Sequence, residues 1–192
     1  MKIAHLHLFF LCFFLNMITR DAWSANNEFR LRIQAEPPTL DWNIATDYVS
    51  IGLLYHLMEG LAEYNDKLEA VPALAFWRIS KDGKTYTYYL KPGLMWSDGV
   101  PLTAQHFWDS WERLLNPRTA SGYAYFLYDV VGAREYNESK LKDPHKLGFK
   151  VINQSTFQVT LKAPASYFAT IPAFTVTFPI RKDLIEKWGN SW

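Results

Sequence analysis

Apolar and polar positions alternate along the chain with two different periods, which together predict a mixture of strands and helices. Residues 29–34 carry apolar side chains at odd positions and polar ones at even positions, as a half-buried strand requires. In residues 50–61 the apolar positions recur at helical spacing, with Gly60 near the end. This second pattern predicts an amphipathic helix that lies on a sheet.

A β-hairpin is predicted next along the chain. Segments 76–80 and 85–90 flank the turn Lys81-Asp82-Gly83-Lys84, whose Asp-Gly pair suits a tight hairpin. The second segment consists almost entirely of threonine and tyrosine, which are strong strand formers. Two antiparallel strands are therefore expected here.

The period becomes helical after Thr103, which has the side chain of an N-cap residue, and Asn116-Pro117 ends the helical pattern. The apolar stripe of this helix consists of Phe107, Trp108, Trp111, Leu114 and Leu115. A further strand pair is predicted at 150–152 and 156–161. Because strands and helices follow no regular βαβ order, the predicted fold class is α+β.

The stretch Trp96-Ser97-Asp98-Gly99 raises the question of whether Asp98 belongs to a catalytic corner or to the architecture. Asp and Gly favour tight turns, in which the carboxylate accepts backbone N–H bonds. A catalytic Asp98 would need a base or nucleophile as partner, and none is close in the sequence. We therefore predict a structural turn, with Trp96 as an apolar anchor.

The first two dozen residues have the pattern of a secretory signal peptide. Lys2 is followed by the apolar run 8–15, and Ala22-Trp23-Ser24 offers small residues at the cleavage-determining positions. The run is far shorter than the roughly 20 residues that cross a bilayer, which favours cleavage over a retained anchor. The mature chain is expected to begin near Ala25, with cleavage next to Ser24.

Removal of the signal peptide changes the net charge and the cysteine count of the chain. The chain has 20 basic and 19 acidic residues, and the loss of Lys2, Arg20 and Asp21 leaves 18 of each. A neutral mature chain gives no electrostatic reason to expect nucleic acid or an anionic membrane as partner. Cys12, the only cysteine, also lies in the signal peptide. This argues against a disulfide scaffold and against thiol catalysis.

Motifs for catalysis or metal binding are lacking in the sequence. The five histidines show no metal-ligand spacing, and there is neither a Gly-rich phosphate loop nor a G-x-S-x-G motif. Asp109, Glu112 and Arg113 stand at helical spacing and are interpreted as a solvated face. Two carboxylates brought together by the fold would still allow a glycosidase. The 17% aromatic content suits either a ligand-gripping surface or an aromatic core.

Short motifs follow one another in a fixed order over nearly the whole mature chain. They are Glu36-Pro37-Pro38-Thr39-Leu40-Asp41, Glu59-Gly60-Leu61, Pro72-Ala73-Leu74-Ala75 with Trp77, Asp82-Gly83-Lys84-Thr85-Tyr86-Thr87-Tyr88, Trp96-Ser97-Asp98-Gly99, Ser110-Trp111-Glu112-Arg113, Asn116-Pro117, Thr119-Ala120-Ser121, Tyr167-Phe168 and Ile185-Glu186-Lys187-Trp188-Gly189. Each motif is weak alone. The ordered set resembles the family 5 solute-binding proteins, the periplasmic oligopeptide- and dipeptide-binding components of ABC importers, and most of all their oligopeptide-binding branch.

The resemblance implies a two-lobed protein that closes over an extended peptide and holds its backbone as a neighbouring strand would. It further implies a monomeric periplasmic protein that delivers oligopeptides to an inner-membrane ABC permease, without enzymatic activity, cofactor or metal. Family members are much longer, so the chain is expected to be an N-terminal fragment in which the second lobe is missing. The expected organisation is a signal peptide at 1–24, the start of lobe I at 25–58, its inserted smaller subdomain at 59–182 and a truncated return into lobe I at 183–192.

Three ligand-binding residues, Thr46, Tyr48 and Tyr123, are implied by the resemblance. Thr46 and Tyr48 lie in the segment that lines the peptide cleft in the family, and Thr46 stands where oligopeptide binders have a glutamate. Tyr123 matches a ligand-facing tyrosine of the family, with Gly122 in place of a frequent proline. The alternatives are an ordinary surface loop for Thr46 and Tyr48, and packing against the helix of Trp111 for Tyr123.

Three other interpretations remain open at this point. The same scaffold could bind a non-peptide solute such as a nickel chelate, haem or a sugar oligomer. An exported carbohydrate-active hydrolase would use the aromatic surface differently, and replacing Asp98 with Asn would then abolish turnover rather than merely destabilise the fold. A third interpretation is the product of a truncated gene that has lost the binding role.

Overall fold

The computed structural model describes residues 30–189. The predicted signal peptide and its cleavage position lie outside the described residues. The chain divides into two units at Gln34 and Ala35, and the described part of the first unit is residues 30–34. These residues form no strand, so the strand prediction for 29–34 is wrong over its described part. A period-two pattern makes a strand only where a neighbouring strand takes its backbone hydrogen bonds, and no described strand pairs with 30–34.

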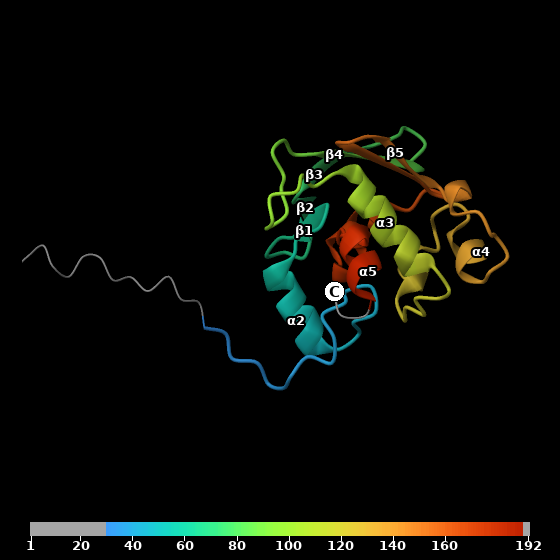
Figure 1. The fold of residues 1–192 in the computed structure, drawn as a ribbon. Helices are drawn as coiled ribbons and strands as arrows, with labels where there is room; N and C mark the ends of the chain where they lie inside the picture. The colour runs from blue at the N-terminus through green and yellow to red at the C-terminus, as the bar shows by residue number, and fades with distance from the viewer. Residues whose placement is uncertain (1–29, 190–192) are drawn as a thin grey trace, which may run out of the picture. The chain divides into compact units, whose positions relative to one another are not determined.

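The second unit contains a four-stranded antiparallel sheet made of the two predicted hairpins, which lies along its upper edge in Figure 1. Its strands are β3 (Ala75–Ile79), β4 (Thr85–Leu90), β5 (Phe149–Asn153) and β6 (Thr156–Thr160), in the order β3-β4-β6-β5. The two hairpins join through β4 and β6, where Tyr86 lies opposite Val159 and Tyr88 opposite Phe157. Both predicted strand pairs are confirmed.

Helix α3 (Ala104–Leu115) covers the inner face of this sheet, and its predicted start and end are confirmed (Figure 1). Trp111 is fully buried at the centre of the interface. Its ring meets Phe157 and Phe149 edge to face at centroid distances of 5.1 and 5.9 Å. The indole N–H donates to the carbonyl of Thr177 at 2.9 Å. This one side chain therefore joins the helix to the sheet and to the chain that returns beneath it.

The other helices and strands lie around this core. They are α2 (Tyr48–Leu57), β1 (Ala62–Tyr64), β2 (Ala70–Pro72), α4 (Ala133–Asn137), α5 (Lys182–Trp188) and the 3₁₀ helices η1 (Ala124–Leu127), η2 (Pro144–Lys146), η3 (Ser166–Ala173) and η4 (Thr175–Thr177). In the described part of the chain, no helix is long and apolar enough to cross a membrane.

Helix α2 differs from its prediction in both bounds and packing. It begins two residues earlier than expected, because the Asp47 side chain accepts the backbone N–H of Ser50 at 2.9 Å and caps the helix. It ends at Leu57, since Met58 is already extended. The helix packs against η4 rather than on the sheet. The predicted helix is present, but of its own residues only Ser50 and Leu54 are buried, so the predicted apolar face is not seen.

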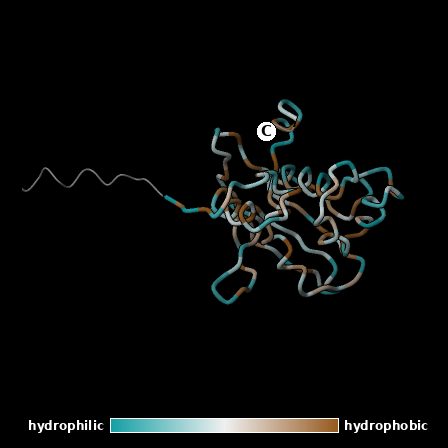
Figure 2. The backbone as a smooth tube through the Cα atoms, turned by 90° about the horizontal axis from the view of Figure 1, so that it is seen from below, coloured by the Kyte–Doolittle hydropathy of each residue, from teal (hydrophilic) through white to brown (hydrophobic). Residues whose placement is uncertain are grey.

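Two clusters of buried apolar residues hold the second unit together. The larger lies between the sheet, α3, η1 and η3. The smaller consists of Trp42, Ala45, Leu54, Phe178 and Ile180. Figure 2 shows hydrophilic positions along the outlying loops, as expected for segments outside these clusters. The domain boundaries predicted at 58/59 and 182/183 remain a prediction.

A matched pair of tyrosines on β4 tests the energetics of this core. Tyr86 donates its hydroxyl to the carbonyl of Ala165 at 2.8 Å, whereas the buried hydroxyl of Tyr88 has no hydrogen-bond partner among the described residues. Burial raises the pKa of the Tyr88 hydroxyl well above its usual range. An unpaired buried hydroxyl costs about 1–3 kcal/mol. We expect Tyr88→Phe to raise the free energy of unfolding by about 1 kcal/mol.

Tyr86→Phe is the control, because it removes a hydroxyl that has a partner. It is expected to lower the free energy of unfolding by about 1 kcal/mol. Urea unfolding followed by tryptophan fluorescence measures both variants. Equal destabilisation by the two substitutions would contradict the difference in hydrogen bonding.

Candidate functional site

The loop before α2 is ordered by its own polar side chains. The backbone N–H of Asp41 donates to Thr39 Oγ1 at 3.0 Å, and the Asp41 carboxylate accepts the backbone N–H of Asn43 at 3.1 Å. The Asp41 carbonyl accepts the backbone N–H of Ala45 at 2.9 Å. Asp and Thr side chains favour such local turns. The motif Thr39-Leu40-Asp41 therefore shapes the loop that leads to Thr46.

Two buried side chains tie this loop to the returning part of the chain. The indole N–H of Trp42 donates to the carbonyl of Phe178 at 3.1 Å. The Asn43 amide donates to the carbonyl of Val176 at 2.9 Å and to Ser110 Oγ at 3.2 Å. Each bond joins residues at least 67 positions apart in sequence. The loop is thereby fixed to α3 and to the segment around η4.

Arg113 completes the attachment from the side of α3. Its guanidinium donates to both carboxylate oxygens of Asp41, at 2.8 and 2.6 Å, and to Asn43 Oδ1 at 2.8 Å. The side chains of Arg113 and Asp41 are only 21% and 12% exposed. A bidentate pair of this kind fixes orientation as well as distance. We call this pair, with Asn43, the loop clamp.

The predicted solvated face of α3 is therefore wrong. Arg113 belongs to the loop clamp, and Asp109 is buried, where it accepts a hydrogen bond from Gln105 at 2.9 Å. Burial raises the pKa of the Asp109 carboxyl. Glu112 accepts a hydrogen bond from the Tyr136 hydroxyl. The helical spacing of these charges was visible in the sequence, but the partners of Arg113 and Glu112 lie on other segments of the chain.

The loop clamp places Thr46 beside Tyr123, two of the three predicted site residues. The Tyr123 hydroxyl donates to the Thr46 carbonyl at 3.4 Å, and the Thr46 side chain is exposed. A Cβ on Gly122 would lie 3.4 Å from Thr46 Cγ2, an ordinary contact. Residues 77 positions apart in sequence thus share one surface.

Tyr48, the third predicted site residue, is the first residue of α2 and is 84% exposed. It lies two positions beyond Thr46, separated from it by the helix cap Asp47. The backbone of Tyr48 is therefore held in the helix, while its ring is exposed to solvent. The roles of Thr46, Tyr48 and Tyr123 in ligand binding remain predictions.

Around Tyr123 the structure gathers aromatic side chains that sequence reasoning did not select. The Tyr123 ring contacts Phe126 and Phe174 at centroid distances of 5.5 and 5.4 Å, and Tyr125 stacks on Phe126 at 4.7 Å. Tyr125 is 53% exposed. We call these four residues the aromatic cluster. High aromatic content was the only signal of it in the sequence, because Phe174 comes from a distant segment.

The Trp96-Ser97-Asp98-Gly99 stretch is a turn, as predicted. The backbone N–H of Gly99 donates to the Trp96 carbonyl at 2.9 Å, and Asp98 accepts the backbone N–H of Val100 at 3.2 Å. The sequence did not reveal that Arg181, 83 positions away, also donates to Asp98 at 2.7 Å. This guanidinium holds the pKa of the Asp98 carboxyl below its usual value. The partners of Asp98 are thus those of an architectural residue.

His106 caps the start of α3 in an unusual way that makes stability depend on pH. Its Nδ1 accepts the backbone N–H of Thr103 at 2.9 Å, so this nitrogen must be unprotonated. Burial lowers the pKa of His106 below its ordinary value of 6.5, although nearby Asp109 opposes the shift. Below about pH 6.5 the unfolded chain therefore binds a proton that the folded chain resists.

We expect the free energy of unfolding to fall as the pH drops from 7.5 to 5.5, because the contribution of His106 is present above its unfolded pKa and is lost on acidification. A single group contributes at most about 1.4 kcal/mol per pH unit. His106→Gln keeps an acceptor for Thr103 without titrating, so this variant should lose part of the dependence. Urea unfolding at several pH values measures it. Parallel curves for both proteins would contradict the assignment.

Metal binding has no candidate in residues 30–189, where no group of three His, Cys, Asp or Glu side chains could hold an ion. The polar groups of the site are instead hydroxyls and carbonyls beside aromatic rings. Such surfaces bind organic ligands through hydrogen bonds and ring contacts.

Comparisons with known sequences identify the family. The family described as bacterial extracellular solute-binding proteins, family 5 Middle, matches residues 67–191. The chain is 38% identical over 165 residues to the oligopeptide-binding protein OppA of Bacillus subtilis, a match that covers 84% of this chain and 30% of the relative. It is 35% identical over 167 residues to the probable deoxycholate-binding periplasmic protein YgiS of Escherichia coli, covering 85% of this chain and 31% of that protein.

Comparison with solved structures gives the same family. The substrate-binding domain of an oligopeptide ABC transporter from Bacillus anthracis matches with a TM-score of 0.81 and 32% identity, over 84% of this chain and 31% of that one. OppA of Listeria monocytogenes bound to peptide matches with a TM-score of 0.77 and 30% identity, over 81% of this chain and 31% of that one. The chain spans about a third of the length of these relatives and has the fold of part of a two-lobed binding protein. It belongs to the family 5 bacterial extracellular solute-binding proteins.

Proposed function

We propose that this chain is part of a periplasmic protein that captures extended oligopeptides and delivers them to an ABC permease without chemical change. The observation that carries the proposal is the contact between Thr46 and Tyr123, which joins a clamped loop to the aromatic cluster on one exposed surface. Relatives named as oligopeptide- and dipeptide-binding proteins, and a similar structure bound to peptide, support the ligand class.

In this proposal Thr46, Tyr48 and Tyr123 face the ligand. Hydroxyl and carbonyl groups of the loop hydrogen-bond to the peptide backbone, which is the same for every peptide sequence. Water fills the space around the peptide side chains. Because Thr46 is neutral, this position offers no carboxylate to a basic group on the ligand, and the chain would not favour basic peptides here.

A non-peptide solute is the second candidate, and the aromatic cluster is the observation that favours it. Tyr125 is exposed and stacks on the half-buried Phe126, and this ring surface suits a flat apolar molecule as well as a peptide. A relative of similar identity is named as a probable deoxycholate-binding periplasmic protein, which supports this candidate.

Native mass spectrometry of the protein recovered from a periplasmic extract distinguishes the candidates. Denaturation after the first spectrum releases the bound molecules for weighing. Released masses that differ by amino-acid residues support the peptide proposal. A single released mass that fits no peptide would replace it with the second candidate, and recovery only from the cytoplasm would contradict both.

The role of Thr46 is tested by introducing a carboxylate at this position, where oligopeptide binders have a glutamate. We expect Thr46→Glu to increase the affinity for a lysine-rich tripeptide over an alanine tripeptide by about tenfold, since one charge-assisted bond contributes about 1.5 kcal/mol or more. Gln154→Glu, in the exposed turn between β5 and β6, adds the same negative charge elsewhere and is the control for altered net charge. An unchanged ratio of affinities would place Thr46 outside the ligand site.

The exported state is part of the same proposal. Cleavage between Ser24 and Ala25 predicts that N-terminal sequencing of the periplasmic protein begins Ala-Asn-Asn-Glu-Phe. An N-terminus that retains the apolar run would indicate a membrane-anchored protein. Size-exclusion chromatography tests the proposed monomer.

A further inference from the structure

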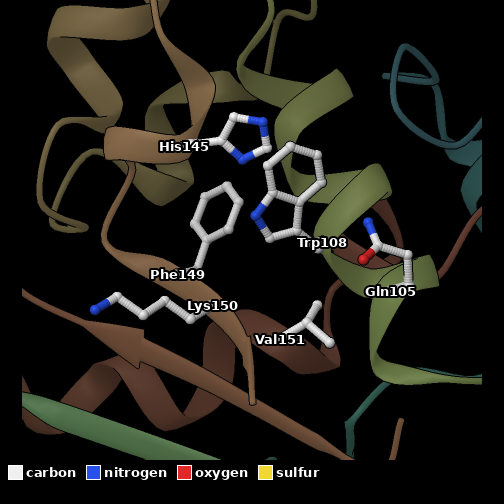
Figure 3. A pocket seen from close by; sticks show the side chains of 6 residues that line it. All are labelled: Gln105, Trp108, His145, Phe149, Lys150 and Val151. Atoms are coloured by element: carbon white, nitrogen blue, oxygen red, sulfur yellow. The ribbon is translucent and has the colours of Figure 1, made fainter. Parts of the chain in front are cut away.

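A pocket of about 310 Å³ lies between α3, η2 and β5 and shares no residue with the candidate ligand site (Figure 3). Its lining consists of Gln105, Trp108, His145, Phe149, Lys150 and Val151. Neither the family resemblance nor the proposed transport function assigns a role to these residues. The pocket therefore needs its own explanation.

Aromatic rings give the pocket a firm apolar wall. Trp108 stacks on His145 with ring centroids 5.5 Å apart and planes 19° from parallel, and it meets Phe149 edge to face at 6.0 Å. Phe149 is buried and also packs against Trp111 in the core. In Figure 3 the rings of Trp108, His145 and Phe149 lie close together, with the Val151 side chain nearby. The rings already form this wall without a ligand. Little conformational entropy of these side chains would therefore be lost when a ligand side chain binds against them.

The chain segment that carries His145 and Lys150 is rich in lysine. Lys150 lines it and is exposed, and no carboxylate is among the lining residues. Residues 140–150 contain four lysines and one histidine against the single acidic residue Asp143. The carboxylate of Asp143 accepts the backbone N–H of His145 at 3.0 Å. The segment therefore has few negative charges to balance its lysines.

Most of these lysines have no ionic partner among the residues that the structure describes. Lys140 pairs with Glu138 at 2.6 Å, whereas Lys142, Lys146 and Lys150 form no ion pair with any residue between 30 and 189. The carboxylate next to the pocket on α3 is Asp109, which is buried and held by Gln105. The free cations thus face outward, where they would attract an acidic partner.

We propose that this pocket is a docking site for an acidic segment of a partner protein, which inserts one large apolar side chain against Trp108 and Val151 and places its carboxylates beside Lys150. The volume is at the lower end of the range for small-molecule sites, about 300–1,000 Å³, and it suits one anchoring side chain. The lysines continue along the chain beyond the pocket, which favours a segment with several carboxylates over a single small anion.

Fluorescence anisotropy with a labelled peptide tests the proposal. The probe is Asp-Glu-Asp-Phe-Glu-Asp-Glu with both ends blocked, and the control peptide is its neutral counterpart Asn-Gln-Asn-Phe-Gln-Asn-Gln. We expect the acidic probe to bind at least about tenfold more tightly than the neutral one, with affinity falling as salt is raised. Equal binding of the two peptides, or no binding at millimolar protein, would overturn the proposal.

Four variants locate the binding. Lys150→Glu reverses a charge on an exposed side chain and should weaken the probe at least about tenfold. Lys67→Glu, in the exposed turn between β1 and β2, makes the same change elsewhere and should leave binding unchanged. Trp108→Ala also removes a contact with the buried Phe149, so it affects core packing as well as the pocket. A loss of binding in this variant counts for the proposal only when Lys150→Glu weakens the probe too. If Tyr123→Phe rather than Lys150→Glu weakens the probe, the acidic peptide binds at the candidate ligand site and the docking proposal fails.

Discussion

Replacing Gly60 with alanine is expected to lower the free energy of unfolding by about 3 kcal/mol. A Cβ at this position would lie 2.4 Å from the Pro172 carbonyl oxygen and 2.5 Å from Phe178 Cε1. Both neighbours belong to the packed interior, and the first is backbone, so the clash cannot be relieved by turning one flexible side chain. Gly60 is therefore required for close approach, although the sequence suggested only the end of a helix.

Gly52 supplies the matched control on α2. A Cβ at Gly52 would meet no atom within 4 Å, and alanine favours a helix over glycine by about 1 kcal/mol. Gly52→Ala should therefore stabilise the protein, while Gly60→Ala destabilises it. Urea unfolding of both variants gives the comparison. A Gly60→Ala protein as stable as the parent would show that the approach of Pro172 and Phe178 is looser than the structure has it.

Replacing Arg113 with alanine should lower the free energy of unfolding by about 3 kcal/mol, because it leaves the poorly exposed Asp41 carboxylate without its cation. The same change should release the loop that carries Thr46. Hydrogen exchange of the Asn43 and Ala45 amides measures that release directly, since both donate to Asp41 within the loop.

An exposed ion pair is the appropriate control for the loop clamp. Lys162 lies 3.2 Å from Glu135, and both side chains are well exposed. Lys162→Ala should change stability by less than about 1 kcal/mol and leave loop exchange unaltered. If Arg113→Ala behaves like Lys162→Ala, the loop is held by Trp42 and Asn43 alone. Arg113→Lys tests geometry, because a lysine retains the charge but cannot bond both carboxylate oxygens at once.

The two hairpins and α3 were predictable because their signals are local. An Asp-Gly turn joins two strands separated by five residues, and an N-cap and Asn116-Pro117 delimit the helix with neighbouring residues. Burial of Trp111 follows from the same apolar stripe. For these elements, period and turn chemistry agree with the tertiary packing, so the sequence pattern is sufficient.

The candidate site could be predicted only in part. Thr46, Tyr48 and Tyr123 were selected through the ordered family motifs, and the structure brings the first and third into contact. The loop clamp was not predictable. Asp41 and Arg113 are 72 positions apart, and nothing in the spacing of charges on α3 indicates which of them turns inward.

What the sequence by itself determined is therefore the two hairpins, helix α3, the presence of α2, the α+β class, the structural character of the Asp98 turn and the family. Tertiary structure alone decided that α2 packs on η4, that residues 30–34 lack a described partner strand, and that Arg113 faces the loop. The physical reason is the range of the interactions. Periodicity and capping act within one helical turn or one hairpin, whereas partner choice depends on which distant surfaces the whole chain brings together.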